Sequence, residues 1–593
     1  MPLIDLKDAT SRTFDYIVVG GGTAGLTLAT RLTEDVQTSV LVLEAGEENL
    51  NDPLILNMGN YGAHLGRPEY DWCTKTTAQK YSNNTEFHWS RSVDYGFVAD
   101  IDAWELLGNE GWNWDRFDKY MQRAVTRGTP ESLKGLWKKG VQGNGPIQVS
   151  HPPLRLDVDI KAQAALHDLG IPFAPAPLDG DPNGIISGPM TADPKTITRS
   201  YAANAYWVPN SARHSFYVLT GALAHRLITN EVDGELVITG VEFSHKAGDE
   251  RIYFGRASKE VILCLGALKT PQILELSGIG RPDVLEKAGV AVRLALEGVG
   301  ENVQEHINTG VVFEFKDDAP GETFDVLRDP EQAKRHKDLL SKSEGLYTMG
   351  ISTYAFTHPS TLSDKAGEII TEARKKIEAE IAAGKYSPGL VDQYKVQFDN
   401  LDKGVPVCEV AGFPGHLFGP LPAEPGKKYY LVLAALNVGF SRGTIHITTS
   451  DPKVQPAMDP HYFEQEIDLK IFAEVVKFCR KVATAPSLKE FSDDNPVELF
   501  PGTAVTTDEE IAVALHIVSQ FFVLRNSCFI LALDTIGSAS MLPKEKGGVV
   551  DTELKVYGTK NLRIADLSIV PIHFICHSQC NSFPIARVVV SLY

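Results

Sequence analysis

The stretch FDYIVVGGGTAGL at residues 14–26 constrains the fold more than any other part of the chain. An apolar run enters a glycine-rich turn, and a helix-forming stretch follows at residues 26–32. Gly20, Gly22 and Gly25 give the spacing G-x-G-x-x-G, in which the missing side chains let a pyrophosphate approach the amides at the start of a helix. The turn therefore predicts a strand and helix that bind a dinucleotide.

The next predicted strand, residues 39–43, ends at Glu44, which is 19 residues after Gly25. A carboxylate at this place can accept hydrogen bonds from ribose hydroxyls. It would repel the 2′-phosphate of NADP, but it does not separate NAD from FAD.

Two later segments show a similar pattern, an apolar strand that leads into a helix-forming stretch or a loop. Residues 261–265 form an apolar strand before GALKTPQILELSGIG, and residues 561–570 read as a strand followed by a loop. We expect one nucleotide domain assembled from these separated segments. Residues 329–403 carry Lys, Arg and Glu at i, i+4 spacing, which predicts solvated helices, and residues 429–448 predict strands that wall a substrate cavity.

Composition excludes several classes of function. The 593 residues suggest two or more domains at roughly 100 to 200 residues each. The net charge of -19 disfavours nucleic acid and anionic membranes as partners. The chain shows neither a basic and apolar leader nor an apolar run of about 18 to 20 residues, so we expect a soluble cytoplasmic protein.

The seven cysteines are scattered and include no CxxC pair, which agrees with a reducing compartment. Cys576, His577 and Cys580 are close in sequence, but no second ligand cluster lies near them. We expect no metal site.

Several motifs together resemble the glucose-methanol-choline (GMC) oxidoreductases, particularly the aryl-alcohol-oxidase-like members. The resemblance is carried by GALKTPQILELSGIG (266–280), GALAHRL (221–227), VYGTKNLRIADLSIVPIH (556–573), TITRSYAANAYW (196–207), GVGENVQEHI (298–307) and DAWELLGNEGWNWD (102–115). It extends over nearly the whole chain.

The resemblance implies an α/β fold with a discontinuous FAD-binding Rossmann-like domain and a substrate domain built on an antiparallel sheet flanked by helices. The FAD-binding domain would comprise residues 1–75, 205–315 and 530–593, and the substrate domain residues 76–204 and 316–529. The implied cofactor is FAD.

The resemblance also implies which residues hold the cofactor. The glycine turn, with Thr23 and Ala24, would lie at the pyrophosphate, and Glu44, with Ala45 next to it, at the ribose. Ala224 would lie beside the adenine and Asp566 near the flavin end, although plain packing is an equal explanation for an alanine such as Ala224.

In this family an alcohol loses a hydride to the flavin while a base removes its hydroxyl proton, and two histidines face the flavin. His577 in HFICHSQCN corresponds to the second histidine, although His573, four residues earlier, competes for that assignment. An imidazole suits this task because its pKa of roughly 6.5 leaves it basic near pH 7.

The first histidine opens an H-x-x-G-T-x-x-M run in the family, but this chain reads DTIGSASM and has Asp534 instead. An ionised carboxylate about 4 Å from the flavin would oppose its reduction by roughly 4 kcal/mol at an effective dielectric of 20. Burial could instead keep Asp534 protonated. The sequence leaves both readings open.

Two further stretches depart from the family pattern. HWSRSVDYGFVADIDAW (88–104) lacks the middle of an R-G-K-x-L-G-G-S-S-x-I-N block, of which Ser90, Arg91 and residues 99–104 resemble the edges. The end, NSFPIARVVVSLY, departs from the family's closing helix.

The leading hypothesis is an FAD-dependent oxidation of a small aryl or allylic primary alcohol, with oxygen or another electron acceptor, in fungal secondary metabolism. The alternative is a GMC-fold protein without net redox work, either hydroxynitrile-lyase-like or flavin-free.

Overall fold

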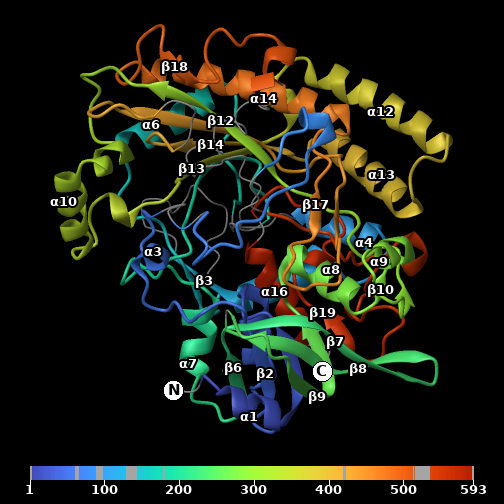
Figure 1. Cartoon of the computed structure of the whole chain (residues 1–593). Coiled ribbons are helices and arrows are strands. Elements are labelled where there is room, and N and C mark those ends of the chain that lie inside the picture. The colour runs from blue at the N-terminus through green and yellow to red at the C-terminus, as the bar shows by residue number, and fades with distance from the viewer. Residues whose placement is uncertain are drawn as a thin grey trace.

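The computed structural model describes residues 3–60, 64, 66–87, 98–128, 143–177, 180–246, 248–417, 422–511, 513–514, 534–577 and 579–590. Two sheets with helices around them form most of this structure, one at the bottom and one at the top of Figure 1. Within these residues, no helix combines the length and apolarity that crossing a membrane requires.

The first sheet has seven strands in the order β6-β2-β1-β9-β8-β7, with β19 paired to β9. Their bounds are β1 Thr13–Val19, β2 Val40–Leu43, β6 Phe216–Leu219, β7 Ala222–Val232, β8 Glu235–His245, β9 Tyr253–Leu263 and β19 Leu562–Ile564. Strands β6, β2, β1, β9 and β19 pair in parallel, whereas β7, β8 and β9 pair antiparallel. The all-apolar segment VLVL of β2 suits a parallel strand, which is buried on both faces.

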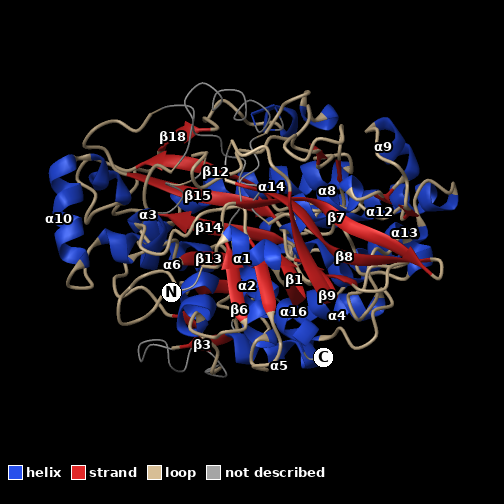
Figure 2. Cartoon of the chain, turned by 60° about the horizontal axis from the view of Figure 1, so that its bottom comes forward, coloured by secondary structure: helices blue, strands red, loops and turns tan. Residues whose placement is uncertain are grey.

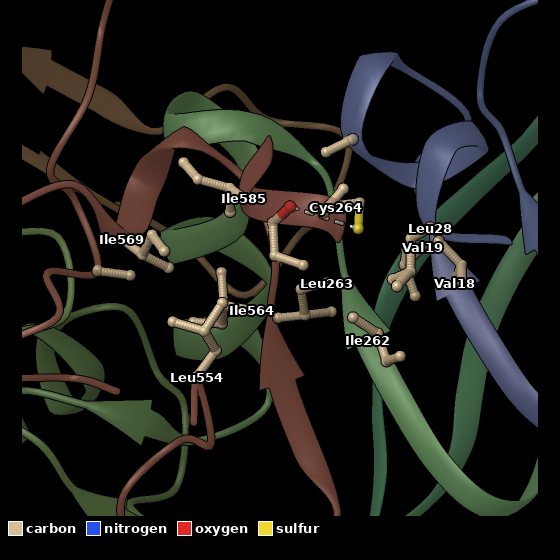
Figure 3. Packing of buried hydrophobic residues seen from close by; sticks show 14 of the residues in the cluster. Val18, Val19, Leu28, Ile262, Leu263, Cys264, Leu554, Ile564, Ile569 and Ile585 are labelled. Carbon is tan, nitrogen blue, oxygen red and sulfur yellow. Dashed lines mark hydrogen bonds between the residues drawn. The ribbon is translucent and has the colours of Figure 1, made fainter. Parts of the chain in front are cut away.

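Helices α2 (Thr23–Leu32), α8 (Gly266–Leu276) and α16 (Gln579–Val590) pack around this sheet. Figure 3 shows the shared core, in which Val18 and Leu28 lie to one side of Ile262 and Ile564, and Ile585 of α16 lies above the central strands. The first and last parts of the chain therefore build one core.

The second sheet is antiparallel, in the order β13-β14-β15-β12-β18. Its strands are β12 Ile307–Glu314, β13 Thr353–Thr357, β14 Cys408–Phe413, β15 Tyr429–Leu436 and β18 Val497–Phe500. Helices α6 (Asp157–Asp168) and α14 (Glu466–Ala483) pack against it, and α12 (Ala366–Ala382) packs on α14. Figure 2 shows both sheets in red with helices around them.

Shorter elements connect these parts. The helices are α1 Leu6–Ser11, α3 Pro53–Leu56, α4 Val98–Leu106, α5 Trp114–Ala124, α7 Val208–Asn210, α9 Pro282–Lys287, α10 Pro330–Leu340, α11 Pro359–Leu362 and α13 Pro388–Asp402. The strands are β3 Val125–Arg127, β4 Ile147–Val149, β5 Gly184–Ser187, β10 Ile279–Gly280, β11 Leu294–Ala295, β16 Thr444–His446 and β17 Ala457–Asp459.

The predicted fold class is confirmed by this arrangement: an α/β sheet assembled from separated segments, beside an antiparallel sheet flanked by helices. The domain boundaries stay predictions. Strand β12 pairs within the second sheet, although its residues fall inside the range 205–315 that we expect for the FAD-binding domain.

The chain end, which departs from the family pattern in sequence, is helical at residues 579–590, in α16. Phe583 and Ile585 are fully buried on either side of Pro584, and α16 packs against α2. Burial of these apolar side chains offsets the backbone donor that proline lacks. The expected defect at residues 88–104 lies mostly outside the described residues, and only 98–104 are seen, in α4.

Candidate cofactor and active site

The turn between β1 and α2 forms a cradle that side chains would fill. Gly20 has φ +104°, and a Cβ added there would lie 2.4 Å from the carbonyl oxygen of Cys264. A Cβ on Gly25 would lie 1.9 Å from the carbonyl oxygen of Gly20, so this glycine lets α2 pack against the turn. Gly22 caps α2 without a side-chain hydrogen bond and faces open space. The helix start is therefore open to an anion.

A cavity of about 330 Å³ opens in front of this cradle. Eight of the predicted cofactor residues line it, namely Gly20, Gly22, Thr23, Ala24, Glu44, Ala45, Ala224 and Asp566. Gly25 is buried behind the cradle instead. The cavity also reaches Trp72, Lys269, Thr535 and Ser582, so it extends from the first βα turn to the C-terminal part of the chain.

Glu44 is anchored at the end of β2. Its Oε2 accepts a hydrogen bond from the Gly21 amide at 2.6 Å, and its Oε1 accepts one from the Gly46 amide at 2.7 Å. Both bonds hold the carboxylate at the wall of the cavity.

Asp566 ties two walls of the cavity together. Its carboxylate accepts hydrogen bonds from the Gly266 amide at 3.0 Å, the Thr270 hydroxyl at 2.7 Å and the Ser568 amide at 2.8 Å. Burial raises its pKa, although these hydrogen bonds act in the opposite direction. Asp566 thus fixes the start of α8 against the turn that follows β19.

His577 pairs with a buried carboxylate that the sequence analysis did not single out. Its Nε2 lies 3.0 Å and 3.1 Å from the two carboxylate oxygens of Glu409 on β14. The amide of Asn437 donates to the same carboxylate at 2.7 Å. Burial raises the pKa of Glu409, but the charge and hydrogen bond of His577, the hydrogen bond of Asn437 and the charge of His306 together outweigh burial and lower it.

A signal for Glu409 does exist in the sequence. It is a charged residue inside the otherwise apolar strand CEVAGF, and charged residues are rarely buried without a partner. The partner could not be read from the sequence because 168 residues separate the pair.

A second cluster lies beside this pair. Nδ1 of His306 is 3.3 Å from Oδ2 of Asp534, and both side chains are almost fully buried. Nε2 of His306 is 3.1 Å from Nδ1 of His573 and 2.9 Å from the carbonyl oxygen of Phe574. The ring centroids of His306 and His577 are 6.2 Å apart, so the two clusters are neighbours.

Glu305 connects this cluster to the cavity. Its carboxylate accepts hydrogen bonds from the amide of Asp534 at 2.8 Å and from the hydroxyl of Thr535, and Thr535 lines the cavity. Glu305 and His306 were missed as functional residues, although both stand in the GVGENVQEHI motif.

Aromatic side chains surround His577. The ring centroids of Tyr354 and Phe356 on β13 lie 5.9 Å and 6.4 Å from the centroid of the imidazole, and both rings meet it edge-on. The structure therefore joins an open dinucleotide cradle to a buried group of imidazoles and carboxylates with an aromatic wall. Such a group can move a proton next to a redox cofactor.

Two sequence models of the GMC oxidoreductase family match the chain, the N-terminal one over residues 14–308 and the C-terminal one over residues 439–586. A GMC oxidoreductase family protein of Malassezia sympodialis is 29% identical over 99% of this chain and 93% of that protein. The dehydrogenase citC of Monascus ruber is 30% identical over 99% of this chain and 97% of that protein.

Solved structures share the architecture. An FAD-dependent oxidoreductase from Chaetomium thermophilum superposes with a TM-score of 0.84 at 26% identity, covering 98% of this chain and 99% of that one. A fungal aryl-alcohol oxidase superposes with a TM-score of 0.79 at 24% identity, covering 98% of both chains, which is evidence for the shared fold.

Proposed function

Because the chain belongs to the GMC oxidoreductase family, we propose that it is an FAD-dependent enzyme that oxidises a small aryl or allylic primary alcohol. The observation that carries this proposal is the cradle and cavity of the first βα turn, which Thr535 and Glu305 link to the cluster of imidazoles and carboxylates that contains His577. The fungal relatives make a role in secondary metabolism a reasonable analogy, and that role is part of the proposal.

The residues present fit FAD. Side chains at Gly20 and Gly25 would collide with the backbone that shapes the turn, whereas Gly22 at the start of α2 faces open space where a pyrophosphate is expected. We assign Gly22, Thr23 and Ala24 to the pyrophosphate. Glu44 and Ala45 are assigned to the ribose, Ala224 to the adenine and Asp566 to the flavin end. Bound FAD would supply the acceptor for the hydride.

His577 is assigned as the base that takes the hydroxyl proton of the alcohol. Its Nε2 lies within hydrogen-bond distance of both carboxylate oxygens of Glu409. Glu409 orients the ring and stabilises the imidazolium that forms. The alcohol then loses a proton to His577 and a hydride from its carbon, and leaves as the aldehyde. Tyr354 and Phe356 support an aryl or allylic substrate because their rings lie edge-on beside His577.

The first test is the absorption spectrum of the purified protein under anaerobic conditions. We expect flavin bands that bleach when an aryl alcohol is added. His577→Gln should retain FAD, but the rate at which the alcohol reduces this FAD should fall about 100- to 10 000-fold, as expected for loss of a general base. Glu409→Gln should give a smaller decrease, and His336→Gln, a buried histidine on α10, should leave the rate unchanged.

A second candidate function is favoured by one observation, the aspartate at the position of the family's first histidine. A GMC-fold protein without net redox work, such as a lyase, would retain FAD without bleaching, and a flavin-free relative would be colourless. Either result would contradict the alcohol oxidation.

A further inference from the structure

One cationic side chain of the cofactor cavity has no role in the assignments above. Among the described residues that line the cavity, Lys269 on α8 is the only lysine or arginine, whereas Glu44 and Asp566 line it with carboxyl groups. FAD carries its negative charge on the diphosphate. Bringing that charge into a cavity walled by carboxyl groups costs free energy unless positive charge is present as well. Lys269 lies where it can supply this charge.

The ammonium group of Lys269 is held by side chains from three segments. Its Nζ donates hydrogen bonds to Oε1 of Gln272 at 2.9 Å and to Oε1 of Gln455 at 2.7 Å. It also lies 4.9 Å from the centroid of the Trp72 ring, in a cation–π contact. Gln272 belongs to α8, Gln455 to the turn before β17, and Trp72 to the segment 66–87. The side chain is therefore half-buried and directed rather than extended freely into solvent.

The backbone fixes the orientation of Gln272. Its Nε2 faces the carbonyl oxygens of Val454 at 2.8 Å and of Pro452 at 3.4 Å. A carbonyl oxygen only accepts hydrogen bonds, so the amide nitrogen of Gln272 donates to both, and its Oε1 is directed to Lys269. Gln272 and Pro452 line the cavity themselves. The contacts that orient the ammonium group thus form part of the cavity wall.

Trp72 is held in place by its own turn. The Asp71 carboxylate accepts hydrogen bonds from the amides of Gly66 at 2.9 Å and Cys73 at 3.1 Å. Cys73 adopts a φ of +49°, which is uncommon for a residue other than glycine and turns the chain sharply after Trp72. Trp72 is 45% exposed although it lines the cavity, so it lies at the open side.

We propose that Lys269 is a further cofactor-binding residue that recognises the anionic diphosphate of a dinucleotide, with Trp72 and Gln272 positioning its ammonium group. This inference rests on the proposed FAD-dependent function. The backbone amides at the start of α2 favour an anion from one wall of the cavity, and Lys269 adds a full positive charge from the wall formed by α8.

A purely structural lysine would behave differently. If Lys269 only tied α8 to the turn before β17, its removal would loosen the cavity and weaken every ligand alike. A charge that recognises the diphosphate affects only ligands that carry phosphate. ADP and adenosine separate the two roles, because they share the adenine and ribose and differ in the diphosphate.

Titration calorimetry of the FAD-free full-length protein with ADP and with adenosine measures this difference. Lys269→Met should weaken ADP binding about tenfold or more, the loss expected for a charge-assisted contact, and leave adenosine binding within about twofold. Lys269→Arg, which keeps the charge, should retain most of the affinity for ADP. Raising the ionic strength should weaken ADP binding to the natural protein more than to Lys269→Met, because salt screens only the charge.

The positioning role of Trp72 is tested in the same way. Trp72→Leu should weaken ADP binding by a smaller factor, about two- to fivefold, since it removes a cation–π contact but leaves the charge. An unchanged affinity for ADP in Trp72→Leu would refute this role of the ring.

Lys453→Met is the matched control. Lys453 is an exposed lysine in the same turn as Pro452, but it is not among the described residues that line the cavity. Its substitution removes the same charge from the same region and should leave ADP binding unchanged. An equal loss of ADP affinity in Lys453→Met and Lys269→Met would mean that general charge, not a contact, attracts the ligand.

Two further results would overturn the proposal: an unchanged affinity for ADP in Lys269→Met, or an equal loss for ADP and adenosine. The two proposals of this article fail differently. Bound FAD that no alcohol bleaches contradicts the alcohol oxidation but leaves the role of Lys269 intact, whereas normal ADP binding by Lys269→Met contradicts only the role of Lys269.

Discussion

At the scale of single residues, the three glycines of the first turn have different tasks. A Cβ on Gly22 would meet nothing within 4 Å, whereas one on Gly25 would lie 1.9 Å from the Gly20 carbonyl oxygen. We therefore expect Gly22→Ala to leave the unfolding temperature of the FAD-free protein unchanged but to weaken FAD binding, since its methyl group points into the cradle.

Gly25→Ala should lower both the unfolding temperature and the affinity for FAD, because it forces α2 away from β1 at a cost of about 1 to 3 kcal/mol or more. Thermal unfolding of the FAD-free variants and fluorescence titration with FAD measure the two effects separately. Equal destabilisation of the two variants would contradict the assigned roles.

The glycines could be found from the sequence because their task is local, between a strand and the helix that follows it. The partners of His577, the proposed base, could not, because Glu409 and His306 reach it only through the pairing of β12, β14 and β15. Residue spacing along one segment carries no information about such contacts.

At the scale of elements, an ionic contact fixes α8 to β16. Nδ1 of His446 lies 2.7 Å from Glu275 at the end of α8, and Nε2 lies 3.3 Å from Glu301. Burial alone would lower the pKa of His446, but the two carboxylates outweigh it and raise this pKa to about 9. Burial also raises the pKa of Glu275, and the hydrogen bonds and charge that it receives from His446 and the Ile447 amide offset this only in part.

This contact predicts how stability depends on pH. The folded-state pKa of about 9 exceeds the ordinary value of 6.5, so the stabilisation is complete below about pH 6.5 and is lost as the pH rises through 9. We expect the unfolding temperature to fall between pH 6.5 and 9.5. His446→Gln should lower it at pH 7, by an amount that corresponds to about 1 to 3 kcal/mol, and flatten this slope.

His461→Gln is the comparison variant, because Asp459 and Glu464 raise the pKa of His461 to about 10 at a more exposed place. It should remove only a small part of the slope. An unchanged slope in His446→Gln would refute the contribution of the α8 contact.

Sequence reasoning at this scale succeeded where the pattern was strong and local. The first strand, helix and second strand were predicted within a few residues, and the charge-rich segment at 329–403 does contain helices α10, α12 and α13. It did not predict the packing of α16, because the burial of Phe583 and Ile585 on either side of Pro584 depends on tertiary contacts.

At the scale of the whole molecule, the cavity is walled by segments from both ends of the chain and from its middle. A ligand that binds only this assembled state stabilises the fold by mass action. FAD added to the FAD-free protein at 100 times its dissociation constant should therefore add about 2.7 kcal/mol and raise the unfolding temperature. ADP, which matches one half of the cofactor, should raise the unfolding temperature only at a higher concentration than FAD. No shift with FAD would contradict the assignment of the cavity.

The packing of α16 against α2 also determines when the protein can become functional during its synthesis. The ribosome completes α2 after Leu32 but does not reach Gln579 until more than 500 residues later. At roughly 5 to 20 residues per second, that interval is on the order of half a minute to two minutes. For this time the nascent glycine turn lacks its covering helix, so a chaperone has a long window to engage it and a prematurely stopped product would never mature.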